Sequence, residues 1–342
     1  IVIKVIVSGT NPKDWKYPFW KDIAQNSGDD IAGTVHAVGK DVYEFALGDR
    51  VAALHVANTA NGSFAEYAVA PDWTTFHIPH NVSFEEAATV PTAALTAAMA
   101  LYGDMKLPPP YSLVGSGGRV PILIYGVTSA VGAFAAKFAR LSGLGPVIGV
   151  AGRAGEFAKT LVDYVVDYRE GEDALVAAVE ATLAKEGLGT KRNGSLEATL
   201  RILDPNGGTV STVLPPKLFA KAKENYEYPP TVKSFNSAVV FIHLTHKDFG
   251  SVWTRYLGRL LGDGRLKAHP YEVVPGGLNG VLTGLQKLKE GNTKAVKYVY
   301  RIEETGNILV TGDANTLGPD GIRISSRPNN NPLRNFPFPA EH

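Results

Sequence analysis

A short apolar run, a glycine turn and a helical pattern follow one another in residues 120–140, and this combination can bind a phosphate group. The run Ile122–Tyr125 is bounded by Pro121 and Gly126, which favours a strand over a buried helix. From Val131 onward, apolar residues recur at helical spacing. A strand that leads directly into a helix leaves unpaired backbone N–H groups at the helix N-terminus, and together with the helix dipole these groups attract a phosphate. The small residues that let the phosphate reach the backbone are Gly126, Ser129, Ala130 and Gly132.

The turn departs from the full G-x-G-x-x-G pattern of dinucleotide-binding proteins. Thr128 stands where the second glycine would be, and Gly126 and Gly132 are six positions apart. The turn by itself leaves two interpretations open: a dinucleotide site, or an ordinary strand-to-helix connection in another α/β protein.

A second short apolar strand, predicted at residues 146–153, indicates which dinucleotide would bind. An NAD site usually has Asp or Glu at the end of this strand to bind the ribose 2′-hydroxyl group, and no acid occurs in the run or in the two residues after it. Arg153 stands there instead, and a guanidinium suits a 2′-phosphate. Lys159 and the Asp-Tyr-Arg run at 167–169 add charge and an aromatic ring. The pattern predicts NADPH rather than NADH; the alternative is that Arg153 is only a solvated surface charge.

Composition and charge exclude several classes of protein. At 342 residues, with 44% hydrophobic and 20% charged residues, the chain is typical of a globular protein of two domains. A formal net charge of +1 gives no general attraction to nucleic acid or to an anionic membrane. No apolar stretch reaches transmembrane length, which predicts a cytoplasmic protein. The chain has no cysteine, which removes disulfides, thiol nucleophiles and thiolate metal sites.

Short β-type runs dominate the first 90 residues and indicate a small β-barrel-like domain. The predicted strands are residues 1–7, 31–38, 50–54 and 64–69. A helical pattern begins at Phe84 and returns at 93–101, before a proline-rich loop at 108–110. An α/β pattern then continues to about residue 268.

Six ordered motifs resemble those of the medium-chain dehydrogenases/reductases. They are Ser-Gly-Thr-Asn-Pro-Lys-Asp-Trp-Lys at 8–16, Gly-Asp-Asp-Ile-Ala-Gly-Thr-Val at 28–35, Val-Gly-Lys-Asp-Val at 38–42, Gly-Asp-Arg-Val at 48–51, Gly-Ser-Phe-Ala-Glu-Tyr at 62–67 and Leu-Thr-Ala at 95–97. Within that superfamily the chain is most similar to the zinc-free quinone oxidoreductases and enoyl reductases, especially the fungal trans-acting enoyl reductases of polyketide pathways.

The resemblance implies an α/β fold in which a doubly wound (Rossmann) parallel sheet is joined to a GroES-like β-barrel domain. Residues 1–90 and 270–342 would form the GroES-like substrate domain, and residues 91–269 would form the Rossmann domain that binds NADPH. It also implies a small-molecule or carrier-bound acyl substrate, a polyketide synthase as partner, and a monomer or homodimer that binds neither nucleic acid nor membrane.

The end of the chain departs from the family pattern. Residues 296–302 resemble the family's closing strand, yet residues 303–342 follow it. From Asn307 the tail reads as two strand-like runs around a Gly-Pro-Asp-Gly turn, which is how these proteins normally begin. This pattern predicts a circular permutation in which residues 306–342 precede residues 1–305 in the ancestral order. The alternative is the same fold with an unrelated C-terminal tail.

A second departure concerns the strand that a doubly wound sheet requires after the helix predicted at 174–184. Residues 185–195 are rich in Gly, Lys, Arg and Asn and contain no apolar run. Either residues are missing, near 162 and 186–195, or the sheet differs there. We favour missing residues, because this strand is central in the fold.

Metal-dependent chemistry has little support in the sequence. Zinc-dependent relatives bind their metal with a cysteine and a Gly-His-Glu segment, but here there is no cysteine and Gly28-Asp29-Asp30 takes the second place. The histidines show no metal-binding spacing; His243 and His246 lie in or beside a run, 239–244, that reads as a strand, where surface or packing roles are expected. The G-x-S-x-G turn of serine hydrolases is absent as well.

Without a metal to polarise a simple ketone, the favoured substrate carries its own electron sink. We therefore expect metal-free hydride transfer from NADPH to the β-carbon of an enoyl thioester or enone, which leaves an enolate. Two alternatives stay open: quinone reduction, and a protein that binds NADPH without turnover.

The resemblance also gives individual residues their roles. The predicted catalytic residues at the nicotinamide end are Asn11, Lys16 and Thr96. The predicted pyrophosphate contacts are Gly126, Thr128, Ser129, Ala130 and Val131. The other predicted cofactor contacts are Arg153, Lys159 and Tyr168 at the 2′-phosphate, Val213 and Leu214 at the nicotinamide amide, and Lys297 in the closing strand.

Plainer roles stay open for several of these residues. Asn11 would cap a turn before Pro12. Thr96 would bond its own helix backbone, and Tyr168 would be a core residue. Asp14 is predicted to be structural, and no general acid stands out. The aromatic side chains that would either line an apolar substrate pocket or pack between the domains are Trp15, Tyr17, Phe19 and Trp20.

Overall fold

The computed structural model describes most of the chain, with gaps. The described ranges are 1–21, 25–112, 120–188, 207–213, 230–291 and 293–306, with the single residues 202 and 228. The tail from residue 307 onward lies outside them, so the permutation stays a prediction. Residues 189–200 lie outside them too, which leaves the missing strand untested.

Seven strands of the β-rich part form one open sheet. They are β1 (Val2–Gly9), β2 (Asp30–Ala37), β3 (Arg50–Leu54), β4 (Tyr67–Val69), β5 (Thr75–His77), β11 (Tyr271–Val273) and β12 (Lys297–Arg301). Their order is β11-β12-β1-β2-β3-β5, with β4 also paired to β1. The strands that the structure describes do not close into a barrel, which corrects the expectation of a barrel. The edge strands β5 and β11 are three residues long and are not paired with each other.

Strand β12 brings the end of the described chain back to its beginning. It pairs antiparallel with β1, so that Val7 faces Arg301 and Gly9 faces Val299. The backbone N–H of Thr10 then donates to the carbonyl of Tyr298 at 3.0 Å. This register places Lys297, the first residue of β12, beside the segment that follows β1.

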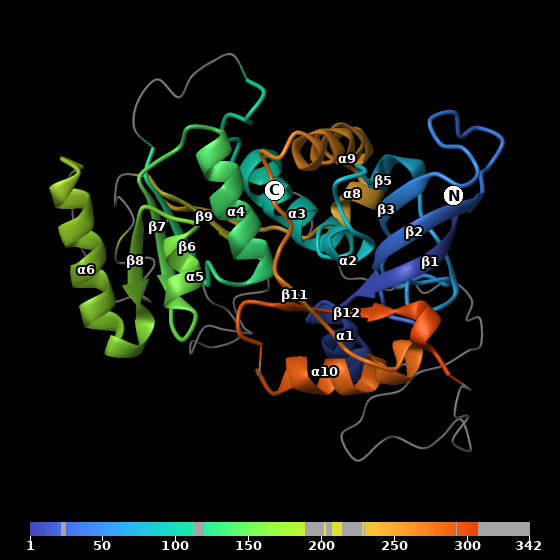
Figure 1. The fold of residues 1–342 in the computed structure, drawn as a ribbon. Coiled ribbons are helices and arrows are strands. Elements are labelled where there is room, and N and C mark those ends of the chain that lie inside the picture. The colour runs from blue at the N-terminus through green and yellow to red at the C-terminus, as the bar shows by residue number, and fades with distance from the viewer. Residues whose placement is uncertain are drawn as a thin grey trace.

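A three-stranded parallel sheet, in the order β6-β7-β8, lies at the opposite end of the molecule from β1–β3 (Figure 1). Its elements alternate as β6 (Ile122–Tyr125), α4 (Ala130–Leu141), β7 (Val147–Ala151), α5 (Gly155–Lys159), β8 (Tyr164–Asp167) and α6 (Glu172–Lys185). Apolar residues of α4 pack on one face of the sheet and those of α6 on the other. All five residues of β7 are buried, because helices cover both faces of a parallel sheet.

Two further strands, β9 (Thr209–Thr212) and β10 (Lys233–Asn236), pair in parallel as a separate two-stranded sheet. In the part of the chain that is described, the expected doubly wound sheet is therefore divided into two pieces. Strand β9 ends immediately before Val213, which is the segment predicted to meet the nicotinamide.

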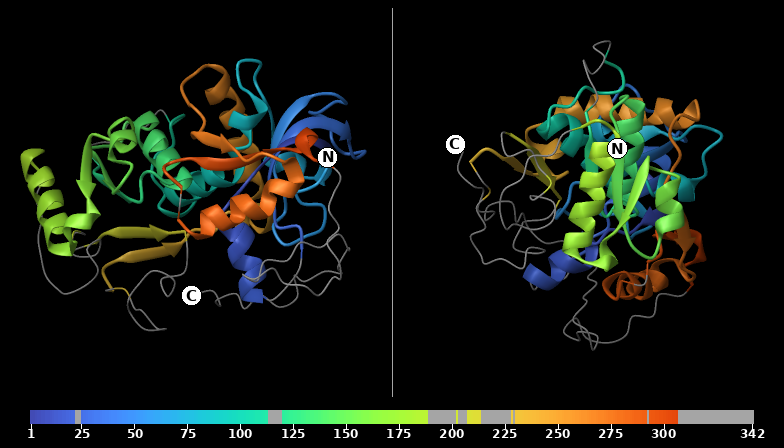
Figure 2. Two further views of the ribbon diagram at one scale, coloured as in Figure 1. Left: turned by 60° about the horizontal axis from the view of Figure 1, so that its bottom comes forward. Right: turned by 90° about the vertical axis from the view of Figure 1, so that its left-hand side faces the viewer.

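Helices join the two ends of the molecule into one core. In Figure 1 and in the left view of Figure 2, α3 (Pro91–Ala98) and α9 (Lys247–Gly262) lie between the parallel sheet and the β-rich part. A single apolar cluster runs from Val7 of β1 through Leu95 of α3 and Trp253 of α9 to Phe134 of α4. The α3 helix continues into a π-helix at Met99–Asp104. The remaining helices are α1 (Lys13–Lys21), α2 (Phe84–Ala87), α8 (Phe241–Leu244) and α10 (Val281–Lys289).

The strand predicted at residues 239–244 is wrong. Residues 239–240 form a turn that leads into the short helix α8. Its Ile242 is fully buried in the core, and a short apolar run alone does not distinguish a buried strand from a buried helix.

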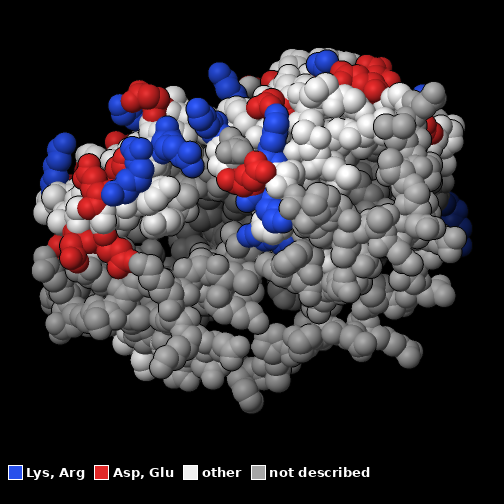
Figure 3. Space-filling view, turned by 90° about the horizontal axis from the view of Figure 1, so that it is seen from below, with Lys and Arg blue, Asp and Glu red and all other residues white. Residues whose placement is uncertain are grey.

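Acidic and basic side chains alternate over the described part of the face in Figure 3, in keeping with the net charge of +1. None of the described helices is long and apolar enough to cross a membrane.

Candidate active site

The predicted phosphate turn is a glycine turn that leads directly into the N-terminus of α4. Gly126 has a φ of 72°, in the left-handed region that favours glycine, and its N–H donates to the carbonyl of Val150 at 3.0 Å. The side chain of Ser129 caps α4 by accepting from the N–H of Gly132 at 3.1 Å. A Cβ atom on Gly132 would lie 2.4 Å from the carbonyl oxygen of Gly126, so only glycine lets the helix start this close to the strand. The N–H groups of Ala130 and Val131, in the first turn, have no helical carbonyl to bond and suit a phosphate.

The residues predicted for the 2′-phosphate lie at or beyond the carboxyl ends of the parallel strands β7 and β8. The ring of Tyr168 covers Gly152, where a Cβ would meet a ring carbon at 2.7 Å, and its centroid lies 6.2 Å from that of Tyr125. Tyr168 is 46% exposed and is therefore not a core residue. Arg153 is exposed next to this pair, whereas Lys159 is in an ion pair with Glu156 at 2.6 Å.

Tyr125 was not among the predicted cofactor contacts, although its position in the sequence indicates one. It is the last residue of β6, directly before the glycine turn, and it is 56% exposed in a strand whose other residues are apolar. A large aromatic side chain at this edge of a parallel sheet lies where ligands bind in such folds.

Asn11 is the centre of a buried polar group of four residues that includes a lysine from the far end of the chain. Its Nδ2 donates to Asp30 Oδ2 at 2.8 Å and to Thr92 Oγ1 at 3.3 Å. Its Oδ1 accepts from Lys297 Nζ at 3.2 Å, and Lys297 also forms an ion pair with Asp30. The N–H of Thr92 donates to the other oxygen of Asp30 at 2.7 Å. We call Asn11, Asp30, Thr92 and Lys297 the Asp30 group.

These contacts decide some of the predicted roles. Asn11 does not use its side chain to cap a turn, because the amide is bonded within the Asp30 group. Lys297 is 4% exposed and its ammonium is bonded to protein groups, so its role in binding cofactor stays a prediction. The hydroxyl of Thr96 donates to the carbonyl of Thr92 at 2.6 Å, as in the plainer reading of that residue. Lys16 lies outside the group, with Nζ 5.5 Å from the centroid of the Trp15 ring, and burial lowers its pKa.

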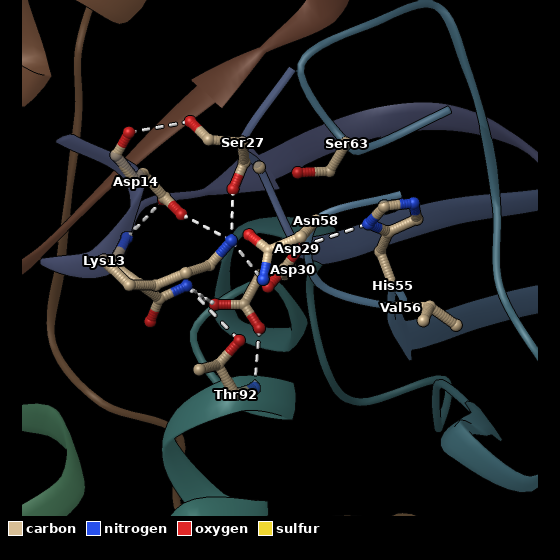
Figure 4. A network of polar contacts seen from close by, with 12 residues as sticks. Lys13, Asp14, Ser27, Asp29, Asp30, His55, Val56, Asn58, Ser63 and Thr92 are labelled. Atoms are coloured by element: carbon tan, nitrogen blue, oxygen red, sulfur yellow. Dashed lines mark hydrogen bonds and ion pairs between the residues drawn. The ribbon is translucent and has the colours of Figure 1, made fainter. Parts of the chain in front are cut away.

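A second buried polar group, which the sequence reasoning did not identify, surrounds Lys13 (Figure 4). Lys13 Nζ lies 2.6 Å from Asp29 Oδ2 and 3.1 Å from Asp14 Oδ1, and it donates to the carbonyl of Ser27. His55 Nδ1 lies 3.1 Å from the other oxygen of Asp29. The side chains of Asp14, Asp29 and His55 are at most 2% exposed, and that of Lys13 is 30% exposed. We call Lys13, Asp14, Asp29 and His55 the Asp29 group.

The charges of the Asp29 group shift each other's pKa values. Burial raises the pKa of Asp14 to about 7, against the opposing effect of Lys13. Burial alone would raise the pKa of Asp29 as well, but Lys13 and His55 hold it below its usual range. Burial would lower the pKa of Lys13, but the two carboxylates outweigh it and raise the pKa. Two carboxylates share one ammonium, so Asp14 is the member that binds a proton near neutral pH.

The Gly28-Asp29-Asp30 segment is poorly suited to a metal. Asp29 is paired with the ammonium of Lys13, and Asp30 with that of Lys297. Within the described ranges, no group of three or more His, Asp or Glu residues is placed to hold a metal ion. Protein ammonium groups thus occupy the positions in which these carboxylates would meet a cation.

The two histidines of the α8 region have different surroundings. His243 is 7% exposed, burial lowers its pKa to about 4, and neither of its ring nitrogens has a hydrogen-bond partner among the described residues. His246 is half-buried and bonds through Nδ1 to the hydroxyl of Thr245 at 2.8 Å.

The remaining predicted residues are only partly placed. Val213 follows β9 and is 45% exposed, whereas Leu214 lies outside the described residues. Trp15 packs against the apolar cluster of α10 and β12, which agrees with a packing role, and the side chains of Phe19 and Trp20 lie outside the description.

Comparison with known sequences agrees with this architecture. Residues 1–80 match the family described as the alcohol dehydrogenase GroES-like domain. The trans-enoyl reductase fsr4 of Gibberella fujikuroi is 39% identical over 292 residues, which cover 82% of this chain and 85% of that protein. The trans-enoyl reductase resD of Aspergillus sclerotiorum is 30% identical over 333 residues, which cover 88% of this chain and 92% of that protein.

Solved structures show the same fold. The CurK enoyl reductase matches with a TM-score of 0.66 and 21% identity, over 87% of this chain and 90% of that one. The quinone oxidoreductase from Coxiella burnetii matches with a TM-score of 0.61 and 21% identity, over 88% and 90%. The fold is therefore a GroES-like domain joined to a Rossmann-like domain. The chain belongs to the medium-chain dehydrogenase/reductase superfamily, in the family of the fungal trans-enoyl reductases, and is an oxidoreductase.

Proposed function

We propose that this protein reduces the conjugated C=C bond of an enoyl thioester with NADPH and without a metal. The observation that carries the proposal is the pairing of Asp29 with Lys13 and of Asp30 with Lys297. A site whose carboxylates are already neutralised by lysines favours a substrate that carries its own electron sink. The relatives named as trans-enoyl reductases support the same reaction.

The cofactor end supports NADPH over NADH. Arg153 is exposed beyond β7, and residues 146–155 contain no acid to bind a ribose 2′-hydroxyl group. The rings of Tyr125 and Tyr168 form an exposed aromatic surface at the same edge of the sheet. A 2′-phosphate near the Arg153 guanidinium would gain a charge-assisted contact that NADH cannot make.

NADPH, when bound at α4, supplies the hydride that adds to the β-carbon of the substrate. The chain's own residues hold the reactants and stabilise the charge that develops on the substrate oxygen. We assign Lys16 to that oxygen, and Thr96 and the Val213 segment to the nicotinamide end. The Asp30 group fixes the segment that carries Asn11 and Lys16, because it ties β1, β2, α3 and β12 together.

The proposed substrate and partner rest on the resemblance to the trans-enoyl reductases. We propose an acyl chain on a thioester carrier as the substrate, and a polyketide synthase as the protein that presents it. Enones and quinones are the competing substrates that the test must separate.

Steady-state oxidation of NADPH and of NADH, followed by absorbance against enoyl thioesters, enones and quinones, tests the proposal. We expect turnover with enoyl thioesters and a preference for NADPH. Arg153→Ala should reduce that preference by at least about tenfold, the value of one charge-assisted contact, whereas Arg140→Ala, which removes another exposed arginine, should leave it unchanged. Turnover with quinones alone would replace enoyl reduction by quinone reduction. Cofactor binding without turnover on any substrate would contradict an enzymatic role.

A further inference from the structure

We propose that Lys13 donates the proton that completes the reduction, and that a buried chain of polar groups, Thr59–His55–Asp29–Lys13, renews this proton from solvent. The inference rests on the proposed function, because a hydride added to the β-carbon leaves an enolate whose α-carbon must be protonated. No donor for this step was evident from the sequence.

The polar chain is continuous. Thr59 Oγ1 lies 3.2 Å from His55 Nε2, His55 Nδ1 lies 3.1 Å from Asp29 Oδ1, and Asp29 Oδ2 lies 2.6 Å from Lys13 Nζ. All three separations are compatible with hydrogen bonds or ion-paired contacts. Thr59 is partly exposed, whereas His55 and Asp29 are buried. The chain thus leads from the surface through the protein interior to the ammonium of Lys13.

His55 is placed to pass a proton. Its Nδ1 faces the carboxylate of Asp29, and its Nε2 faces the carbonyl of Ala60 at 2.9 Å as well as the hydroxyl of Thr59. The hydroxyl of Thr59 donates to the carbonyl of Val56 at 2.8 Å. When it turns toward Nε2, the ring can take a proton there and release one from Nδ1 to the Asp29 carboxylate.

Lys13 is the inner end of the chain, and its ammonium also faces Asp14 and the carbonyl of Ser27. It is the most exposed member of the Asp29 group, and it lies between Asn11 and Lys16 in the segment assigned to the nicotinamide end. The carboxyl of Asp14, 3.1 Å from Nζ, holds a second exchangeable proton, because burial raises the pKa of Asp14 to about 7. Asp14 faces Lys13 and Asp29, and its charge also acts on Tyr300; the charge of Asp29 acts on His243.

The proposed cycle accounts for the proton that the substrate gains. The α-carbon of the enolate takes a proton from Lys13, so that a C–H bond forms as an Nζ–H bond breaks and Lys13 is left as a neutral amine. The amine regains a proton from Asp14, or from His55 through Asp29 after the Asp29 carboxyl group rotates. Solvent at Thr59 then returns the proton to the chain. Each turnover consumes one hydride from the cofactor and one proton from water.

Lys13→Arg separates proton donation from structural charge. Arginine keeps the positive charge and the ion pairs, but it does not give up a proton in proteins. We expect a folded protein that binds NADPH with unchanged affinity and has kcat lowered about 100-fold, in the range of lost general acid catalysis. In D₂O, the wild type should place deuterium on one face of the product α-carbon, and Lys13→Arg should scramble it. The matched control is Lys40→Arg, at an exposed lysine, which should behave as wild type.

Thr59→Val tests the entrance of the chain without touching an ion pair. We expect kcat to fall several-fold, with a larger solvent isotope effect and unchanged KM. Lys13→Arg with kcat within about threefold of wild type and the same α-deuterium stereochemistry would overturn Lys13 as donor. An unaltered solvent isotope effect in Thr59→Val would overturn the route from solvent.

One measurement does not depend on turnover. At one fixed pH, NMR should show different ¹⁵N chemical shifts of the His55 ring in Lys13→Met and in wild type, because loss of the ammonium leaves the Asp29 carboxylate uncompensated beside the imidazole. Unchanged ring shifts would contradict coupling along the chain. A wild-type protein that shows this coupling but reduces no enoyl thioester, enone or quinone would refute the proposed function and not the polar chain.

Discussion

The Asp30 group and the Asp29 group are neighbours built from adjacent acids, yet they differ in charge balance and in access to solvent. In the Asp30 group one carboxylate meets one ammonium, and amide and hydroxyl groups bond what is left. In the Asp29 group two carboxylates share one ammonium, and an imidazole approaches from the other side. Protonation of Asp30 would break the ion pair of the Asp30 group and lower the stability of the protein. In the Asp29 group, Asp14 can bind and release a proton near neutral pH.

The lysines of the two groups also differ in burial. Lys297 is 4% exposed, and the ammonium is bonded on several sides by groups from three distant segments. Lys13 is anchored by Asp14 and Asp29 but keeps part of its side chain accessible. A fully enclosed ion pair of this kind holds segments together, and a partly open one is able to act on a substrate.

The largest expected effect comes from removing the enclosed lysine. Lys297→Met leaves the Asp30 carboxylate buried without a counter-ion, which should lower the free energy of unfolding by about 3–5 kcal/mol. Urea denaturation measures this loss. The control is Lys287→Met, whose exposed ion pair with Glu272 should contribute little. The double variant Lys297→Met/Asp30→Asn should recover part of the stability, and a single variant as stable as wild type would show that the Asp30 group is not a structural lock.

A pH-dependent effect is expected from His243, which extends the Asp29 group toward α8. Burial lowers its folded-state pKa to about 4, below the usual 6.5, so its contribution to stability is present above pH 6.5 and is lost as the pH falls toward 4. Asp29, His55 and Lys247 also act on this ring, with smaller effects.

His243→Phe should remove this acid sensitivity, a difference of about 3 kcal/mol between pH 7 and pH 4 from the pKa shift. Urea denaturation as a function of pH measures it, with His80→Phe, an exposed histidine, as the control. Asp14 has the opposite dependence, so only the difference between variant and wild type reports on His243. Parallel stability curves for the two proteins would show that His243 is not buried in its neutral form.

A smaller effect is expected for the partly open lysine. Lys13→Met leaves Asp14 and Asp29 without their cation, but Asp14 can take up a proton instead, so we expect a loss of about 2 kcal/mol at pH 8. The loss should shrink at pH 5.5, because the carboxylates are then more readily protonated. Urea denaturation at the two pH values measures it. A loss that is the same at both, and as large as that of Lys297→Met, would erase the distinction between the two groups.

The sequence predicts those parts of the fold that depend on near neighbours. The strand β6, the capped helix α4 and the strand β7 agree with the predicted boundaries to within a residue or two, because periodicity and Ser129 specify them locally. The strand predicted at residues 239–244 is wrong for the same reason. Its local pattern is typical of a strand, but the segment forms the helix α8, whose Ile242 is buried in the core.

The two polar groups could not be assembled from local patterns. Asn11 and Lys297 are 286 positions apart, and only the pairing of β1 with β12 brings them together. One signal was nevertheless present. Asp30 is the first residue of β2 and Asp29 directly precedes it, so in an extended segment the two adjacent carboxylates point to opposite sides. Once both are buried, each needs a cation on its own side. Lys13 meets the first and Lys297 the second.

The smallest expected change in stability separates the two readings of Thr96. Its hydroxyl bonds the carbonyl of Thr92, within the same helix, so Thr96→Val should cost under about 1 kcal/mol. If Thr96 also contacts the nicotinamide end, kcat/KM for NADPH should fall about tenfold, which is the value of one hydrogen bond. Thr182→Val is the matched control, because that hydroxyl makes the same kind of bond, to Ala178 at 2.8 Å, in the exposed helix α6. Equal kinetics for the two variants would leave Thr96 with the backbone bond as its whole role, and the catalytic contribution of this region would then rest on the Asp29 group.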